Sequence, residues 1–346
     1  MKRILCARQA ELWHGLSSSK VELVGGPAGD EPWEWRDSPE SFDGIFCSTL
    51  PENLNAFTRL RWVQIDSSGF SQLIPADLPA RGVEATNAAG VFDIPIAEWC
   101  LTMMVALARD LPAMVRNQEE TVWDRASRFQ TEIRGATVGF WGYGGLARET
   151  ARLARAFGLR VHVMARGEPR KRTGTFVVPG TGDRDALLPE RVFRASQWRE
   201  FLGGLDFLVM ALPLTEATRG ICGCEQLRAL RSTAYLLNPA RGPLIVESAL
   251  LAALGEGWFA GAALDTHYAY PLPPSHPLWK MPRVILTPHI SGSTGSPGYL
   301  GRVREIFSSN VERFAGGRHL LNRVPPEDLT PVRVQDKTQV HAATRR

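Results

Sequence analysis

The sequence has few cysteines, and their number and spacing argue against a disulfide framework. Five cysteines occur in 346 residues, an odd number that does not suit the paired bridges of a small secreted scaffold. Cys222 and Cys224 are separated by a single residue and have no second pair, which is not the spacing of a structural zinc site. We therefore expect buried or inert thiols, no metal site and a cytoplasmic location.

Long hydrophobic runs and clustered positive charge are also missing. The N-terminal MKRILCARQAELW has too short an apolar run for a secretory signal, and the apolar segment CLTMMVALA at 100–108 is too short to span a bilayer. The net charge of +4 comes from 40 Lys and Arg against 36 Asp and Glu, which are dispersed rather than gathered in a nucleic-acid-binding motif. The sequence predicts no membrane partner and no nucleic-acid partner.

The chain does contain a regular alternation of short apolar strands and helical segments. Its length suits two domains, and the alternation predicts an α/β fold with parallel sheets covered by helices on both faces. The helical segment Pro95–Leu111 is apolar on nearly every side, so we expect it to be buried between domains or between subunits. The stretch 174–188 is predicted to be a loop, and 335–346 a frayed tail. The predicted strands are Arg3–Cys6, Gly44–Cys47, Arg61–Ile65, Val83–Thr86, Thr137–Trp141, Arg160–Met164, Asp206–Leu212, Ala234–Asn238, Ala260–Leu264 and Val284–Thr287.

A glycine-rich turn follows the predicted strand Thr137–Trp141. The sequence GYGGLA at 142–147 has the pattern G-x-G-x-x-A, and the helical ARETARLARAF and another strand follow it. The first glycine would allow a tight turn, the second would let a pyrophosphate approach the backbone, and the alanine would let the helix pack closely. Free amides at the helix N-terminus attract phosphates. This βαβ unit predicts a dinucleotide-binding fold with four residues at the cofactor, namely Gly142, Gly144, Gly145 and Leu146.

The next strand leads into a basic segment, VHVMARGEPRKR at 161–172. Ala165 stands where an NAD-binding protein usually has the carboxylate that binds the adenosine ribose, and Arg166 follows it. Arg166 would bind a ribose 2′-phosphate through charge-assisted hydrogen bonds. Arg170, Lys171 and Arg172 could close over the same phosphate, although a solvated turn is the alternative for two of these three. We predict NADP as the preferred cofactor, with NAD as the second choice.

Three later stretches resemble the D-isomer-specific 2-hydroxyacid dehydrogenase family, which includes phosphoglycerate dehydrogenases and glyoxylate/hydroxypyruvate reductases. They are LLNPARGPLIVESALLAAL (236–254), GAALDTHYAYPLPPSHPLW (261–279) and VILTPHISGST (284–294). The N-terminal stretches LRWVQIDSSGF and TNAAGVFDIPIAEW are similar to this family as well.

The resemblance implies an architecture and an activity. The architecture has two Rossmann-like parallel-sheet domains: a discontinuous substrate-binding domain (1–93 and 295–334) and an inserted NAD(P)-binding domain (94–294). It usually forms a homodimer, and the helix starting near Pro95 suits that interface. The activity is that of an oxidoreductase acting on the CH-OH group of small D-2-hydroxy acids, or reducing 2-oxo acids such as glyoxylate or hydroxypyruvate.

The resemblance also implies roles for single residues. Arg241 in NPARG matches the catalytic arginine, whose guanidinium can bind the substrate carboxylate and polarise the carbonyl group. His289 in TPHIS matches the general acid. The other matches are Ser68, Gly69 and Phe70, whose backbone amides would bind the other side of the carboxylate, Asp265, which would orient the nicotinamide amide, and Leu212, Pro213 and Thr218, which would line the adenosine and ribose.

Tyr270 occupies the position at which the family usually has a glutamate that hydrogen-bonds to the catalytic histidine, and no Asp or Glu occurs at 266–270. A carboxylate would raise the pKa of the imidazole and favour its protonated form, whereas a phenol can only orient the ring near neutral pH. His267 and Tyr268 are alternative neighbours of His289. This departure keeps two other hypotheses open: a nicotinamide-binding regulator similar to the C-terminal binding proteins, and an enzyme that oxidises a one-carbon or phosphorus oxyanion.

Overall fold

The computed structural model describes residues 1–29 and 31–330, so the predicted tail at 335–346 lies outside the described part. The chain forms two compact units. Unit 1 contains Met1–Ala89, the short segment Gly174–Phe176 and the residues from Leu300 on, whereas unit 2 contains Gly90–Thr173 and Val177–Tyr299.

Unit 1 is built on a five-stranded parallel sheet with the strand order β2-β1-β3-β4-β5. Helix α7 (Pro297–Ala315) packs on this sheet from Leu300 on, and the Phe307 ring stacks on Phe46 at 4.0 Å between centroids. The strands are β1 (Lys2–Cys6), β2 (Val21–Gly25), β3 (Gly44–Cys47), β4 (Trp62–Ile65) and β5 (Glu84–Thr86). The helices are the 3-10 turns Ala10–Leu12, Pro39–Ser41, Leu54–Ala56, Ser71–Ala76 and Pro79–Arg81, and α8 (Pro326–Leu329).

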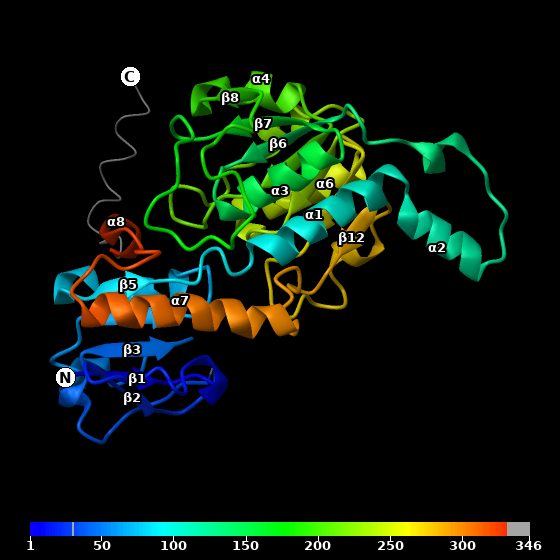
Figure 1. Ribbon diagram of the computed structural model, residues 1–346. Helices are drawn as coiled ribbons and strands as arrows, with labels where there is room; N and C mark the ends of the chain where they lie inside the picture. Colours follow the sequence, from blue (N-terminus) through cyan, green and yellow to red (C-terminus); the bar gives the residue numbers. More distant parts are fainter. Residues whose placement is uncertain (30, 331–346) are drawn as a thin grey trace, which may run out of the picture. The chain divides into compact units, whose positions relative to one another are not determined.

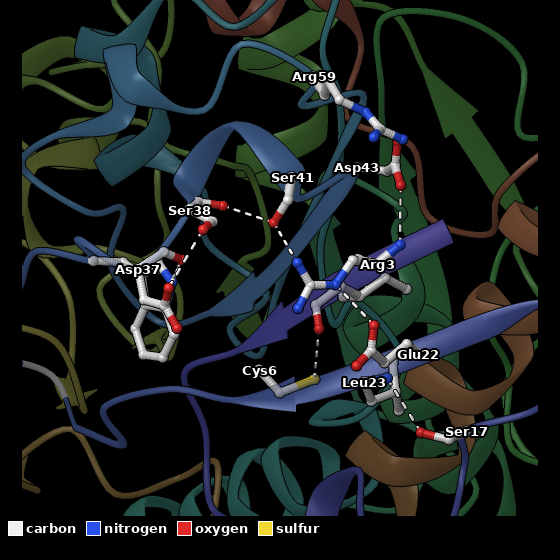
Figure 2. A network of polar contacts seen from close by, with 12 residues as sticks. Arg3, Cys6, Ser17, Glu22, Leu23, Asp37, Ser38, Ser41, Asp43 and Arg59 are labelled. Carbon is white, nitrogen blue, oxygen red and sulfur yellow. Dashed lines mark hydrogen bonds and ion pairs between the residues drawn. The ribbon is translucent and has the colours of Figure 1, made fainter. Parts of the chain in front are cut away.

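A polar network fastens β1 to its neighbours in this sheet (Figure 2). Arg3 donates from Nε to the Glu22 carboxylate on β2 at 2.8 Å, and its guanidinium also contacts Ser41. The backbone amide of Arg3 donates to Asp43 at 2.9 Å, and Asp43 forms an ion pair with Arg59 at 2.9 Å. These contacts fix the edge strand β2 and the turn before β3 through side chains distant in sequence.

Unit 2 is built on a seven-stranded parallel sheet with the order β12-β11-β10-β9-β6-β7-β8. The chain starts at β6 in the middle, proceeds through β7 and β8, and then returns to β9 on the other side of β6. The carboxyl ends of β6 and β9 therefore form the switch point at which doubly wound folds bind ligands. The strands are β6 (Thr137–Trp141), β7 (Arg160–Met164), β8 (Arg191–Phe193), β9 (Phe207–Met210), β10 (Tyr235–Asn238), β11 (Gly261–Leu264) and β12 (Val284–Leu286).

The predicted apolar helix is α1 (Asp93–Ala108), which begins two residues earlier and ends three residues earlier than expected. One side of it packs in the core of unit 2 against α3. Its other side lines an open apolar pocket of about 400 Å³, so the helix is not buried all round within unit 2. Figure 1 shows α2 extending away from the seven-stranded sheet. The remaining helices are α2 (Leu111–Glu119), α3 (Gly145–Ala156), α4 (Trp198–Gly203), α5 (Cys224–Arg228), α6 (Glu247–Gly255) and the 3-10 turns Ser127–Gln130, Ala195–Gln197, Gly242–Leu244 and Pro277–Lys280.

The predicted fold class is confirmed, because both sheets are parallel and each predicted strand overlaps an observed one. The prediction missed β2 and β8, which lie at sheet edges, and β2 is joined to β1 by the Arg3–Glu22 contact in addition to its backbone pairing. The five cysteines are free, and of these only Cys224 is exposed. Within 1–29 and 31–330, every helix is too short or too polar to cross a membrane.

Candidate active site

The glycine-rich turn lies at the carboxyl end of β6, as its sequence predicts. Gly142 adopts a φ of +97°, and a Cβ built there would lie 2.6 Å from the Ala211 carbonyl oxygen, so this position requires glycine. Gly144 faces open space, since a Cβ built there would meet no heavy atom within 4 Å. Helix α3 starts at Gly145, and Ala147 in its first turn is fully buried. Open backbone beside a helix N-terminus fits a pyrophosphate, so the residues present suit a bound dinucleotide.

The positively charged side chains of the basic segment after β7 have different surroundings. Arg166 is exposed and makes no ion pair within the described part of the chain. Lys171 pairs with Asp185 at 3.1 Å in an exposed contact, so its charge is partly neutralised there.

The remaining two arginines of this segment lie nearer to α3. The Arg170 carbonyl accepts a hydrogen bond from the buried Arg148 at 2.8 Å, and the Arg170 side chain is exposed. Arg172 instead points toward the glycine-rich turn, where its Nη1 lies 3.9 Å from Asp93. The structure therefore does not gather Arg170, Lys171 and Arg172 around one position.

The loop after β9 contains the residues predicted beside the adenosine and ribose. The Leu212 side chain lies against Gly142, at 3.0 Å from a Cβ built on that glycine. Thr218 donates its hydroxyl to the Pro213 carbonyl at 2.6 Å and accepts from the Thr215 amide at 2.8 Å. These bonds close the loop on itself, so Thr218 has a structural role in shaping it.

Arg241 follows β10 in a turn that is fixed by a buried asparagine. Asn238 donates to the Arg241 carbonyl at 2.9 Å and accepts from the Ala240 amide at 3.1 Å. A Cβ on Gly242 would lie 2.6 Å from the His267 backbone, so the turn packs directly against the segment after β11. Arg241 itself is partly exposed, and its Nη1 donates to the Ala240 carbonyl at 2.7 Å.

Asp265 follows β11 and is fully buried. Its carboxylate accepts hydrogen bonds from the Thr287 hydroxyl at 2.6 Å, from the Ile290 amide at 2.9 Å, and from both the amide and the hydroxyl of Ser291. Its backbone carbonyl accepts from the His289 amide at 2.8 Å. Asp265 therefore organises the loop that carries His289, where the backbone of the histidine has a φ of +57°.

Tyr270 is the neighbour that contacts the His289 ring. The two rings lie 5.5 Å apart between centroids, and the Tyr270 oxygen accepts a hydrogen bond from the His267 amide at 3.1 Å. The other two alternatives have different partners: His267 bonds to the Thr287 carbonyl at 2.8 Å through Nε2, and Tyr268 donates to the Ile245 carbonyl.

The surroundings of His289 lower the pKa of its imidazole below the ordinary value. Partial burial contributes most, and the positive charge of Arg241 and the nearby His267 act in the same direction, while Asp265 opposes them. Within the described residues, no carboxylate hydrogen-bonds to this ring. A neutral imidazole is thus favoured, as expected for a histidine without a glutamate partner.

The loop Ser68–Phe70 follows β4 in unit 1. Its shape is held by Asn87, which donates to the Ser68 carbonyl at 2.8 Å, and by Ser67, which donates to the Gly69 carbonyl at 2.8 Å. Sequence reasoning overlooked a buried ion pair at 2.7 Å between Arg8 and Asp66, which lie after β1 and β4. Their positions in the sequence could have indicated this pair, because charged residues that directly follow parallel strands gather at one edge of the sheet.

Comparison with known proteins gives consistent matches. Residues 101–291 match the family described as D-isomer specific 2-hydroxyacid dehydrogenase, NAD binding domain. A glyoxylate reductase of Thermofilum pendens is 31% identical over 70% of this chain and 69% of its own length, and one of Korarchaeum cryptofilum is 31% identical over 80% and 79%. A crystal structure of a D-isomer specific 2-hydroxyacid dehydrogenase from Xanthobacter autotrophicus, in complex with NADPH and MES, has a TM-score of 0.76 at 25% identity and covers 95% of this chain and 99% of that one.

Proposed function

Because the chain belongs to the D-isomer specific 2-hydroxyacid dehydrogenase family, we propose that it is an NAD(P)H-dependent reductase of small 2-oxo acids, with glyoxylate and hydroxypyruvate as the first candidates. The observation that carries this proposal is one parallel sheet that places the glycine-rich turn after β6, Arg241 after β10 and His289 after β12. The relatives named glyoxylate reductase support this substrate class.

The proposed roles follow from the chemistry of the side chains. Bound NADPH would supply the hydride. Arg241 binds the substrate carboxylate and stabilises the charge that develops on the carbonyl oxygen. His289, as imidazolium, donates a proton from its ring to that oxygen, while Tyr270 supports the ring and Asp265 holds its loop.

The preference for NADPH over NADH is part of the proposal. Arg166 directly follows the position of the usual acidic residue, and it is exposed, without an ion pair in the described part of the chain. A free guanidinium suits a ribose 2′-phosphate. The similar Xanthobacter dehydrogenase was crystallised with NADPH, which supports the same preference.

Unit 2 corresponds in this proposal to the NAD(P)-binding domain, with the predicted bounds 94–294. Unit 1 corresponds to the discontinuous substrate-binding domain, 1–93 and 295–334, in which Ser68, Gly69 and Phe70 are the proposed substrate-binding residues. We propose a cytoplasmic location because the five cysteines are free and disulfides persist mainly in oxidising compartments.

A homodimer is the oligomeric state that the surface of unit 2 supports. The apolar pocket of about 400 Å³ lies beside α1 and α2. Trp123, in the segment that follows α2, is 91% exposed, which is unusual for so large an apolar side chain. A second copy would cover these surfaces, and light scattering of the purified protein tests this.

The decisive experiment is a panel of 2-oxo acids with NADPH and NADH, monitored by the loss of reduced-nicotinamide absorbance. We expect turnover with glyoxylate or hydroxypyruvate. The missing carboxylate partner of His289 favours the regulatory alternative, a nicotinamide-binding protein without turnover. That alternative would be supported by tight NADPH binding together with no reduction of any acid in the panel.

A further inference from the structure

Two opposite charges lie against the first residue of α3. A Cβ built on Gly145 would lie 1.9 Å from the Asp93 carboxylate and 2.7 Å from Nη1 of Arg172. Any side chain at position 145 would therefore collide with them, and the glycine leaves room for both groups. The carboxylate therefore lies beside the first residue of the helix whose free N-terminal amides are suited to bind phosphate.

These two charges come from segments that are distant in sequence but belong to unit 2. Asp93 is the first residue of α1, which packs along α3. Arg172 lies in the segment after β7, and its backbone amide donates to the Arg184 carbonyl at 3.1 Å. The packing of α1 on α3 thus positions Asp93 near the glycine-rich turn, and the hydrogen bond to Arg184 positions Arg172. Neither contact depends on the ion pair between the two side chains.

The ion pair is loose and shielded from solvent. Arg172 and Asp93 are 3.9 Å apart, with side chains 17% and 16% exposed. Burial raises the pKa of Asp93 to about 6, Arg172 acts against this shift, and Glu149 of α3 adds to it. Glu149 is itself paired with Arg152 at 2.6 Å. The Asp93 carboxylate is therefore a poorly stabilised anion at this position.

We propose that Arg172 binds the pyrophosphate of the dinucleotide rather than its 2′-phosphate, and that the Asp93 carboxylate occupies this anion-binding position until the cofactor arrives. This inference rests on the cofactor assignment made above. An arriving pyrophosphate competes with the carboxylate for Arg172, and the two negative charges repel each other. Asp93 then takes up a proton from solvent, so cofactor binding is coupled to proton uptake.

The first test compares NADH with NADPH by calorimetric titration, without substrate. Arg172→Met should lower the affinity for both cofactors by the same factor, about tenfold or more, because both contain the pyrophosphate. Arg166→Met should lower the affinity for NADPH alone. The matched control is Arg184→Met, which removes a positive charge from the same segment at an exposed position and should change neither affinity.

Two outcomes would overturn the role of Arg172. If Arg172→Met weakens only NADPH, the arginine binds the 2′-phosphate, and if it changes neither affinity, the arginine does not bind the cofactor. Thermal melting without cofactor reports whether the variant is folded. If Arg172→Met does not fold, Arg172→Lys can be used, because it keeps the positive charge but lacks the planar guanidinium. It should lower the affinities for NADH and NADPH by a smaller factor that is equal for both.

The second test uses Asp93→Asn with ADP-ribose, which has the pyrophosphate but lacks a 2′-phosphate that would titrate near pH 6. Well below pH 6 most of the wild-type carboxyl is protonated, so the two proteins should bind nearly equally there. As the pH rises toward 8, wild-type affinity should fall severalfold while that of Asp93→Asn stays level. Equal pH dependence of the two proteins would overturn the role of Asp93.

These measurements remain interpretable if the proposed activity is wrong. Binding is measured without substrate, so a protein that reduces no 2-oxo acid can still show the expected pattern. If the wild type binds neither NADH nor NADPH, the cofactor assignment itself fails.

Discussion

The glycine-rich turn after β6 is proposed to contact the dinucleotide, and the histidine loop after β12 is proposed to contact the substrate. The two segments are nevertheless built differently. The turn is local, because its glycines and the α3 N-terminus lie within 142–147. The histidine loop depends on Asp265, which is 26 residues from Ser291, one of its partners. The conformation of the turn can be recognised from a short motif, whereas the part that Asp265 plays in holding the histidine loop depends on contacts between residues distant in sequence.

The largest effect is expected at Arg241, whose turn is held by the nearby Asn238. Arg241→Ala should lower kcat/KM by about 10³-fold, because the charge on the carbonyl oxygen loses its stabilising group. The dissociation constant of NADPH should stay nearly unchanged, and Arg241→Lys should restore activity only in part. Arg199→Ala, an exposed arginine paired with Glu225, is the control, and equal activity of Arg241→Ala and wild type would remove Arg241 from the site.

Asp265→Asn tests whether the histidine loop depends on one carboxylate. The amide group would present hydrogens to the donors of Ser291, so the loop should shift. Because a displacement of about 1 Å can cost roughly 10²-fold in rate, kcat should fall by that amount with little change in NADPH affinity. If NADPH affinity falls in parallel, Asp265 instead contacts the nicotinamide amide, as the family resemblance implies.

Arg166→Asp tests the cofactor-binding region, namely whether Arg166 binds the ribose 2′-phosphate of NADPH. One charge-assisted hydrogen bond contributes roughly 1.5–3 kcal/mol, or about tenfold to hundredfold in cofactor discrimination. The ratio of kcat/KM for NADPH to that for NADH should therefore be lost or reversed in the variant. A wild type that prefers NADH would contradict the prediction.

The smallest effect concerns Tyr270 and the pH dependence of reduction. The pKa of His289 is lowered, so its protonated fraction falls as the pH rises from mildly acid to neutral, and reduction should weaken over that range. In Tyr270→Glu the added carboxylate should raise this pKa and move the falling limb by about one pH unit upward. Tyr270→Gln is the uncharged control, and identical limbs for Glu and Gln variants would show that residue 270 exerts no charge effect on the histidine.

Much of the fold could be predicted, since alternating strands and helices imply parallel sheets. The edge strands β2 and β8 were missed, because their apolar patterns are short: Val21 and Leu23 are the buried residues of β2, and Phe193 is the buried residue of β8. The neighbour of His289 could not be fixed from the sequence: Tyr270 stood at the usual glutamate position, with His267 and Tyr268 as alternatives, and the ring contact identifies Tyr270.

The sequence alone determined the βαβ turn, because Gly142 must adopt a positive φ and lie next to the Ala211 carbonyl, which glycine alone allows. Only the tertiary structure decided where the side chains around it are directed. Four cations follow β7 within seven residues of sequence, yet Lys171 pairs with Asp185 and Arg172 reaches Asp93. The physical reason is that a backbone conformation is a property of a few neighbouring residues, whereas the partner of a charge depends on which distant segments pack beside it.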